Sequence, residues 1–304
     1  MTCLLEIYDG TGEFESDLFY IDTMAHGIKS SIGVLVYRNG EESVVFDSGM
    51  PNSANRILTS LKKLGIGHES IRHILLTHRH IDHAGSASFM LEYLPNALIG
   101  IHPFSVKQLA EPSRIYEGGK ALFGEYAKPM QSVRTSLMRA LGDGEEIRVG
   151  EEVVRAIYTP GHTSDHIGYY VPSKKAFFCG DVIGAFDTQV KKLWPTCMYP
   201  SFDYQEYKTS MERIRSLDLA ILAFPHFGVA TGRDVKDILD QSLAVHGALE
   251  RIVIDNMGKL TVERLVQEFK TVLNEATGIF PESVRERAAE FMARGFIKGI
   301  GIQT

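Results

Sequence analysis

The sequence is poor in cysteine and in long apolar runs. Cys3, Cys179 and Cys197 are its only cysteines among 304 residues. Three thiols in a chain of this length cannot form a disulfide framework, which excludes the disulfide-stabilised classes and agrees with a reducing compartment. No apolar run approaches the ~18 residues of a membrane-spanning helix. We therefore expect no membrane partner.

An excess of basic residues is also absent. Lys and Arg number 32 against 38 Asp and Glu, which gives a formal charge of -6. This balance argues against a nucleic-acid partner, and we expect a small-molecule substrate instead. Residues 1–9 lack the basic start of a secretory signal, so we expect a cytoplasmic protein.

Short strand and helix signals alternate up to about residue 230. Apolar, β-branched runs at 31–37 and 43–46 flank Asn39-Gly40 and predict a hairpin. A helix is expected over 54–64, before Gly65. Further strands are expected at 73–77, 98–101, 153–158, 167–171, 176–179 and 220–224. The alternation predicts a layered α/β domain over residues 1–230.

Residues 231–304 differ, because helical periodicity replaces the strand signal. Apolar residues recur at three- and four-residue spacing behind a Thr261 cap, and a last helix is expected over 281–294, closed by Gly295. We interpret this segment as a helical C-terminal extension. Residues 111–141 are rich in aromatic residues and methionine without strand alternation, and we interpret them as an inserted helical flap.

Metal-binding residue types are concentrated directly after the strand expected at 73–77. Within six positions the chain carries His78, His80, Asp82 and His83. Neutral imidazole and carboxylate are ligands for zinc, iron and manganese. On an extended strand end His78 and His80 point to the same side, so they can share one ion. Asp82 and His83 follow as the chain turns into the next helix, and they can face a second ion.

Three later positions can complete this coordination. His162, Asp181 and His226 each lie just beyond an expected strand, with a glycine close by. Strand ends that meet at one rim of a sheet bring such side chains together. The sequence therefore favours a metal site built from four separate segments.

The ordered set resembles the metallo-β-lactamase superfamily of dinuclear metal hydrolases, whose first motif reads His-x-His-x-Asp-His. The resemblance covers roughly residues 15 to 230 and implies a four-layer αββα sandwich. It implies one ion held by His78, His80 and His162, a second held by Asp82, His83 and His226, and Asp181 bridging both. It also implies that Asp47 supports the ligands from behind. The expected cofactors are two divalent ions; zinc is the first expectation, and iron or manganese accept the same set.

Differences between branches of the superfamily indicate which branch the sequence resembles most. Oxygen-reducing diiron members carry Glu at the position of His80, and secreted β-lactamases commonly carry Cys at the position of Asp181 and lack the neighbouring His83. Segment 158–167 looks most like glyoxalase II and related cytoplasmic thioesterases. The resemblance implies hydrolysis of a thioester or related ester by metal-bound hydroxide, with catalytic parts for Asp82 and Asp181. The alternatives are a lactonase, a phosphodiesterase or RNA-cleaving hydrolase of the same fold, and a non-catalytic regulatory protein.

The sequence defines the substrate side less well. We expect four side chains near the substrate: Tyr126, His166, Trp194 and Tyr199. The alternative for the histidine is a hydrogen-bonded structural role, and for the aromatic residues a place in the core. The C-terminal helices pack on their own core, cover the site or pair two copies of the chain in a homodimer, and the sequence leaves these three arrangements open.

Overall fold

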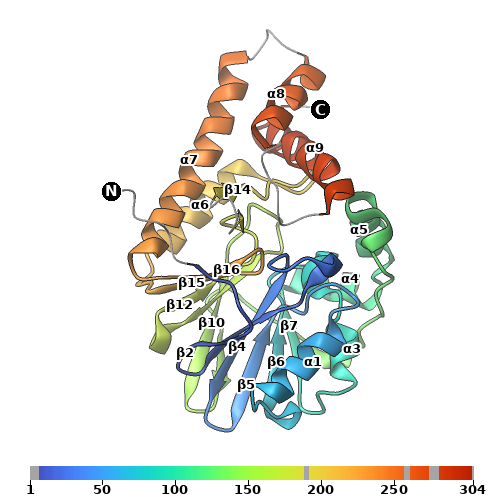
Figure 1. Cartoon of the computed structure of the whole chain (residues 1–304), viewed down its shortest axis with the longest axis vertical. Coiled ribbons are helices and arrows are strands. Elements are labelled where there is room, and N and C mark those ends of the chain that lie inside the picture. The colour runs from blue at the N-terminus through green and yellow to red at the C-terminus, as the bar shows by residue number, and fades with distance from the viewer. Residues whose placement is uncertain (1–6, 188–191, 257–260, 274–280, 303–304) are drawn as a thin grey trace.

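The computed structural model describes residues 7–187, 192–256, 261–273 and 281–302. In these residues two seven-stranded sheets stack on each other, with helices on both outer sides (Figure 1). Helices that follow the last strand rise above one rim of the sheets.

The N-terminal sheet has the strand order β2-β3-β4-β5-β6-β7-β8. Its strands are β2 (Gly12–Glu15), β3 (Leu18–Asp22), β4 (Gly33–Asn39), β5 (Glu42–Phe46), β6 (Ile71–Leu75), β7 (Leu98–Ile101) and β8 (Met138–Ala140). β2 to β5 pair antiparallel, and β5 to β8 pair parallel. Parallel neighbours need crossover connections. The crossovers contain α1 (Ala54–Lys63), α2 (Ile81–Ala84), α3 (Ala87–Leu91), α4 (Val106–Ala110) and α5 (Ser113–Phe123).

The C-terminal sheet has the strand order β1-β16-β15-β12-β11-β10-β9. Its strands are β1 (Ile7–Tyr8), β9 (Glu146–Val149), β10 (Glu152–Tyr158), β11 (Ile167–Val171), β12 (Ala176–Phe178), β15 (Ile221–Phe224) and β16 (Gly228–Thr231). Only β12 and β15 pair parallel within this sheet, and the chain between them contains α6 (Tyr204–Arg215). A small separate sheet pairs β13 (Ala185–Asp187) with β14 (Lys192–Trp194).

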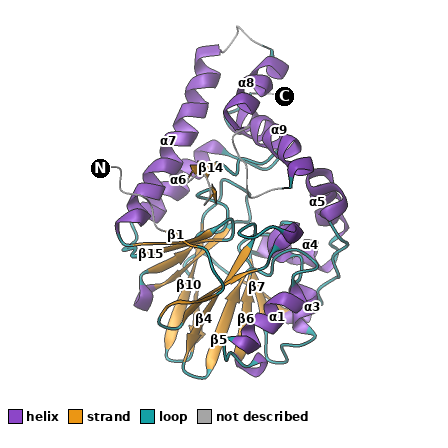
Figure 2. Ribbon diagram, in the orientation of Figure 1, coloured by secondary structure: helices purple, strands orange, loops and turns teal. Residues whose placement is uncertain are grey.

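Side-chain alternation along the strands builds the layers. In β4, Leu35 packs between the two sheets, whereas Val34 packs against the helices outside the N-terminal sheet. In β12, Phe178 packs between the sheets, whereas Phe177 packs on the outer side with residues of α6 and of α7 (Arg233–Asn256). A period of two divides each strand between two apolar layers in this way. The four-layer αββα sandwich is thus confirmed (Figure 2).

Several expected elements are confirmed. The hairpin is formed by β4 and β5, and the strands at 98–101 and 167–171 have the expected bounds. The sequence did not indicate β2 and β3. Their tight turn has Asp17 in the left-handed conformation, with φ 63°, where a glycine would have marked it.

The flap expected over 111–141 is only partly helical. Its first part forms α5, but its last residues form β8, which pairs parallel with β7. The prediction of a helical insertion is therefore wrong over 138–140, because these residues complete the edge of the N-terminal sheet.

The C-terminal residues form α7, α8 (Val262–Leu273) and α9 (Glu282–Gly299). The Thr261 cap is confirmed, since its Oγ1 accepts the backbone N–H of Arg264 at 3.3 Å. The expected helix end at Gly295 is wrong, because α9 continues through it. A Cβ on Gly295 would lie 2.0 Å from the carbonyl oxygen of Cys197, so this glycine allows close helix packing. Within the described residues, no helix combines the length and apolar character needed to cross a bilayer.

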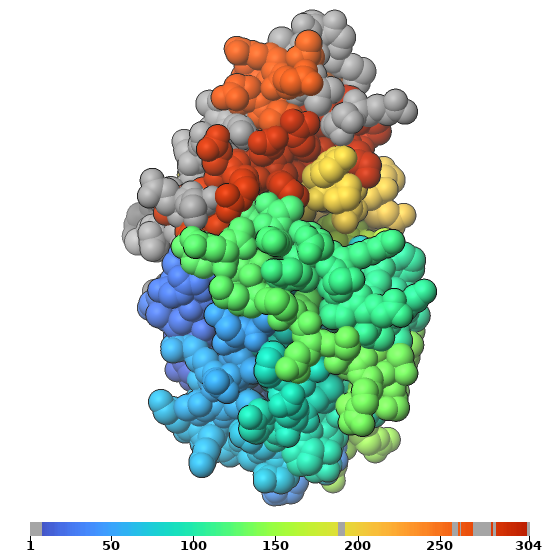
Figure 3. Space-filling view, turned by 90° about the vertical axis from the view of Figure 1, so that its right-hand side faces the viewer, coloured from blue at the N-terminus to red at the C-terminus, as the bar shows by residue number. Residues whose placement is uncertain are grey.

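Helix α9 lies against α5 and against the segment that precedes α6. Arg287 donates from Nε to the carbonyl oxygen of Leu122 in α5 at 2.8 Å. The backbone N–H of Tyr199 donates to the carbonyl oxygen of Phe291 at 3.0 Å. Figure 3 shows the surface of α9 (red) directly above that of α5 (green). The extension therefore packs onto the sandwich at the rim above the sheets.

Candidate metal centre and its cavity

The predicted ligands meet at one rim of the two sheets. His78 and His80 follow β6, with His80 at the start of α2, the helix that also contains Asp82 and His83. The other three sit in loops: His162 after β10, Asp181 after β12 and His226 between β15 and β16. Side chains from four segments thus converge as expected from the strand ends.

The first cluster consists of three imidazoles. His80 Nδ1 lies 3.0 Å from both His78 Nε2 and His162 Nε2. His162 Nδ1 is hydrogen-bonded to the carbonyl oxygen of Thr196, which can only accept. The proton of neutral His162 is therefore on Nδ1, and its Nε2 presents a lone pair. Three converging ring nitrogens are the donor set of a tetrahedral zinc site with one open position.

The second cluster combines two imidazoles with a carboxylate. His226 Nε2 lies 3.3 Å from Asp82 Oδ2, while its Nδ1 donates to the carbonyl oxygen of Ser31 at 3.0 Å. His83 Nδ1 lies 2.9 Å from a carboxylate oxygen of Asp47, which leaves His83 Nε2 directed at the cluster. These contacts orient each ring and select its tautomer, as in other metal-binding histidines.

Asp181 lies between the clusters. Its Oδ2 is 3.5 Å from His162 Nε2 in the first cluster. Its Oδ1 is 3.4 Å from His83 Nε2 and 3.8 Å from His226 Nε2 in the second. One carboxylate that faces both sets of nitrogens has the placement expected of a ligand shared by two ions.

The contact between two buried atoms shows whether a cation fits between the clusters. His83 Nε2 and Asp181 Oδ1 are both buried, and neither makes a hydrogen bond within the described part of the chain. Because His83 donates from Nδ1, its Nε2 lone pair faces the carboxylate oxygen. Two buried electron-rich atoms at this separation repel each other unless a positive charge lies between or beside them. The donor set therefore fits a divalent cation.

The electrostatics of the site agree with this fit. Burial and the neighbouring imidazoles lower the pKa of His78 well below its ordinary value and that of His80 to about 3. Burial alone would raise the pKa of Asp181, but His83 and His226 outweigh it and hold the pKa well below the usual range. Neutral imidazole and ionised carboxylate are the forms that bind metal.

His83 shows the opposite shift. Burial lowers its pKa, but the carboxylates of Asp181, Asp82 and Asp47 outweigh burial and raise the pKa well above the ordinary value. The carboxylates thus favour positive charge at this point, which either a proton or a metal ion supplies.

Asp47 lies behind the ligands. One oxygen accepts the backbone N–H of Thr77 at 2.7 Å, and the other faces His83 Nδ1. The hydroxyl of Thr77 lies 3.0 Å from both Asp47 oxygens and from His78 Nδ1, so it links the carboxylate to a second ring. The sequence indicated Asp47 but not Thr77, a hydroxyl residue between the end of β6 and His78. Its position directly before the first predicted ligand is the signal that could have found it.

His166 is enclosed behind Asp181. Its Nε2 accepts the backbone N–H of Asp181 at 3.0 Å, and its Nδ1 lies 2.8 Å from Thr159 Oγ1. Gly180 permits this approach: its φ is 51°, and a Cβ there would lie 2.4 Å from His166 Nε2. The expected substrate contact of His166 is therefore corrected to a structural contact that holds the Asp181 backbone.

Comparison with known proteins decides the family. The model of the metallo-beta-lactamase superfamily matches residues 30–226, a span that is more than half of the chain and includes every predicted ligand. The chain belongs to the metallo-beta-lactamase superfamily.

The curated proteins that are similar to this chain include enzymes of two kinds. The chain is 26% identical over 235 residues to an atrochrysone carboxyl ACP thioesterase of Aspergillus fumigatus, covering 77% of this chain and 60% of the relative. A relative of the same name from a Cryptosporiopsis species is 29% identical over 157 residues, covering 51% and 39%. A hydroxyacylglutathione hydrolase of Francisella philomiragia is 29% identical over 152 residues, covering 50% and 47%. The chain thus spans from 39% to 60% of the length of these relatives.

Solved structures share the fold. An archaeal superfamily protein from Sulfolobus tokodaii has a TM-score of 0.67 and 22% identity, covering 92% of this chain and 98% of that one. A metallo-beta-lactamase family protein from Thermus thermophilus has a TM-score of 0.59 and 22% identity, covering 89% of each.

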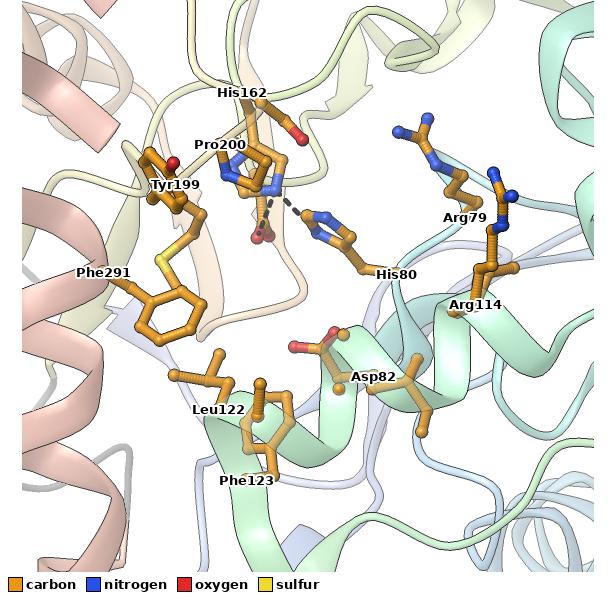
Figure 4. Close-up of a pocket in the computed structure, with 18 of the residues that line it drawn as sticks. Arg79, His80, Asp82, Arg114, Leu122, Phe123, His162, Tyr199, Pro200 and Phe291 are labelled. Carbon is orange, nitrogen blue, oxygen red and sulfur yellow. Dashed lines mark hydrogen bonds and ion pairs between the residues drawn. The ribbon is translucent and has the colours of Figure 1, made fainter. Parts of the chain in front are cut away.

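A cavity of about 660 Å³ opens onto the predicted ligands (Figure 4). Five of the seven predicted ligands line it: His80, Asp82, His162, Asp181 and His226. Its apolar wall comes from α5, the segment before α6, and α9, through Leu122, Phe123, Met198, Pro200, Phe291 and Met292. The C-terminal extension therefore covers the site and forms part of its wall.

The aromatic residues predicted at the substrate divide between the cavity and the core. Tyr199 lines the cavity. Trp194 is buried in β14 and Tyr126 packs edge-on against His26 with ring centroids 5.1 Å apart, and neither lines the cavity. The substrate contacts expected of these two residues are corrected, because their rings pack against protein.

The sequence reasoning missed two parts of the cavity lining. Phe291 and Met292 of α9 have the apolar character of ordinary packing residues, and no pattern sets them apart. Arg79 and Arg114 also line the cavity. Arg79 lies between His78 and His80 in the sequence, and this position could have predicted that it lies near the site. Arg114 lies in the predicted flap and belongs to no motif, so nothing in the sequence marked it.

Proposed function

We propose that the protein is a metal-dependent hydrolase that cleaves thioesters or related esters of small molecules. The observation that carries the proposal is the convergence of seven side chains of metal-binding type, five of which line one cavity with an apolar wall. The names of the relatives support it, since they include ACP thioesterases and a hydroxyacylglutathione hydrolase.

We propose that these side chains would hold two ions. His78, His80 and His162 would hold the first, and the second would be held by Asp82, His83 and His226. Asp181 would serve both. When bound, divalent ions supply Lewis acidity that polarises a carbonyl and makes water nucleophilic near neutral pH. Zinc is our first expectation, and iron or manganese suit the same donors.

The chain's own contribution is to fix the ligands and shape the cavity. Thr196 and Ser31 hold the rings of His162 and His226 with their lone pairs inward, so little rearrangement is needed on loading. Asp82 also lies on the cavity wall. Burial raises the pKa of its carboxyl, but His83 and His226 outweigh burial and lower the pKa, so Asp82 faces the reacting group as an anion.

A covalent thiol mechanism is not supported by the described cysteines. Cys179 and Cys197 are fully buried, and burial raises the pKa of both thiols above the ordinary value. A buried neutral thiol is a poor nucleophile. The proposed attack by water needs no such group, and a thiolate leaving group needs little protonation because thiol pKa values are near ~8.5.

The apolar wall indicates where the acyl group lies. Leu122 and Phe123 of α5 lie with Phe291 of α9 on one side of the cavity (Figure 4). Burial of an apolar chain there contributes about 0.8 kcal/mol per CH₂ group. We therefore propose an apolar acyl group on this side of the ligands.

The test is hydrolysis of coenzyme A and glutathione thioesters by protein of assayed metal content. Asp181→Asn should reduce turnover by about 100-fold or more, because it removes the shared anionic ligand. Asp143→Asn, at an exposed carboxylate outside the cavity, is the matched control and should remain near wild type. Activity of Asp181→Asn within twofold of wild type would contradict the ligand assignment. Absence of turnover on every thioester by fully loaded protein would contradict the proposed reaction.

A further inference from the structure

The end of the cavity opposite the apolar wall is cationic. Six residues from the metal motif, α4 and the start of α5 line it: Arg79, Lys107, Gln108, Glu111, Ser113 and Arg114. Figure 4 shows Arg79 and Arg114 on one side of His80 and Asp82, with Tyr199 and Phe291 on the other. Three of these six side chains are basic and one, Glu111, is acidic. Asp165 behind the lining pairs with Arg79, so the unneutralised positive charge is carried by Lys107 and Arg114. The chain as a whole has a charge of -6, so this concentration of positive charge is local.

Arg79 is held in place by a buried acid. Its Nη1 bonds to Asp165 Oδ1, and its backbone N–H donates to Asp165 Oδ2 at 3.1 Å. Asp165 has a fully buried side chain and also accepts the hydroxyl of Ser105. The Arg79 side chain itself is 19% exposed. An arginine has five N–H donors, so this anchoring leaves donors for a ligand at a fixed position.

Arg114 and Lys107 supply charge that the protein does not neutralise. Both are exposed, and among the residues that the structure describes neither forms an ion pair. Arg114 is the second residue of α5, and the first turn of this helix contains no acidic residue. The N-terminal end of a helix adds partial positive charge. Together with Arg79, these groups create a surface suited to an oxyanion on a ligand that occupies the cavity.

We propose that this cationic end binds an anionic group of the substrate. Resting on the proposed function, the inference specifies the substrate class as a thioester with an apolar acyl group and a thiol half that carries phosphate or carboxylate. The acyl group then lies against α5 and α9, the carbonyl lies at the metal ligands, and the anion lies at Arg79, Lys107 and Arg114. Phosphate and carboxylate share the chemistry that these side chains recognise.

The experiment compares three thioesters of one acyl group. Coenzyme A provides phosphates, glutathione provides carboxylates, and N-acetylcysteamine provides a neutral thiol half. The variants are Arg114→Gln and Lys107→Gln, singly and together, and the matched control is Lys120→Gln, which removes an exposed charge from α5 outside the cavity. Glutamine is a good helix former, so these variants are expected to fold.

The wild-type enzyme should prefer at least one charged thioester over the neutral one in kcat/KM. Arg114→Gln should reduce that preference about tenfold, mainly through KM, because a charge-assisted hydrogen bond is lost. Which thioester loses most distinguishes phosphate from carboxylate. An equal preference in wild type and the double variant would overturn the inference while leaving thioester hydrolysis intact.

A binding measurement separates the inference from the proposed function. Titration calorimetry with free coenzyme A and free glutathione needs no turnover. If wild type binds one of them and the double variant binds it about tenfold or more weakly, the inference stands even where no thioester is cleaved. If Lys120→Gln weakens binding as much as Arg114→Gln, the effect is one of general charge and the inference is overturned.

Discussion

Replacing Asp47 with asparagine tests whether the residues behind the ligands control metal binding. Asp47 is 1% exposed and accepts hydrogen bonds on both oxygens. Oδ1 takes the backbone N–H of Thr77 at 2.7 Å, and Oδ2 lies 2.9 Å from His83 Nδ1. An asparagine can accept on only one of its two terminal atoms. In either orientation its NH₂ group faces a donor that the carboxylate had satisfied.

The magnitude follows from the two orientations. If the NH₂ group faces His83, the ring must accept at Nδ1 and carry its proton on Nε2, the atom directed at the second cluster. If it faces Thr77 instead, a buried backbone N–H loses its partner, at about 1–3 kcal/mol. The first result should weaken metal binding at the second cluster, and the second result should weaken it at the first cluster, because Thr77 contacts His78. We expect a loss of about 10–100-fold in either case.

The assay is metal titration by calorimetry, with metal content measured after dialysis. Wild type should bind two ions, and Asp47→Asn should lose affinity at one of them by the factor above. Asp22→Asn is the matched control, because Asp22 is also buried and accepts the backbone N–H groups of Met24 and Ser30 without contacting a ligand. Unchanged affinity for both ions in folded Asp47→Asn, or an equal loss in Asp22→Asn, would refute the reasoning.

Three further outcomes are expected. Burial lowers the pKa of His246 to about 4, below its unfolded value of ~6.5, so its contribution to stability is complete above pH ~6.5 and is lost as the pH falls towards 4. Other buried histidines, among them His26 and His73, act in the same direction. Chemical denaturation of the metal-free chain should therefore show a loss of stability between pH 7 and pH 5 that is about 2 kcal/mol smaller in His246→Phe than in wild type. Gly295→Ala should destabilise the protein by about 1–3 kcal/mol because its Cβ meets the Cys197 carbonyl, whereas Gly247→Ala, in α7 with no atom within 4 Å, should not. Chelation should abolish turnover and lower the thermal midpoint, with both restored by metal; an unchanged midpoint at demonstrated metal loss contradicts a structural role for the ions.

The sequence predicted which side chains meet at the rim, because these side chains carry their chemistry in their residue types. His78, His80, Asp82 and His83 occur in one short segment, and strand alternation and the following turn are enough to direct them to one place. His162, His226 and Asp181 were found because each follows a strand, and strand ends of one sandwich meet at a rim. The layered α/β class followed from the alternation of strands and helices, whereas the four-layer αββα arrangement was implied by the resemblance to the superfamily.

The contacts that orient these ligands could not be predicted. His162 is held by the carbonyl oxygen of Thr196 and His226 by that of Ser31. Every residue has a carbonyl group, so nothing in the residue type marks the two that act here. His166 illustrates the converse: its residue type is typical of a ligand or a substrate contact, but its neighbour Gly180 lets it bind the Asp181 backbone instead.

The two ends of the cavity explain why the family alone does not define the substrate. The family match covers residues 30–226, which supply the ligands and the basic side chains Arg79, Lys107 and Arg114. Phe291 and Met292 lie outside that span, on α9, yet they complete the apolar wall opposite those basic side chains. A change in α9 can therefore alter the acyl group that fits without moving a ligand. On the proposed function, acyl selection therefore depends in part on a segment that carries no ligand. Variants of α9 should change KM between acyl groups, while variants of the ligands should change kcat for all of them.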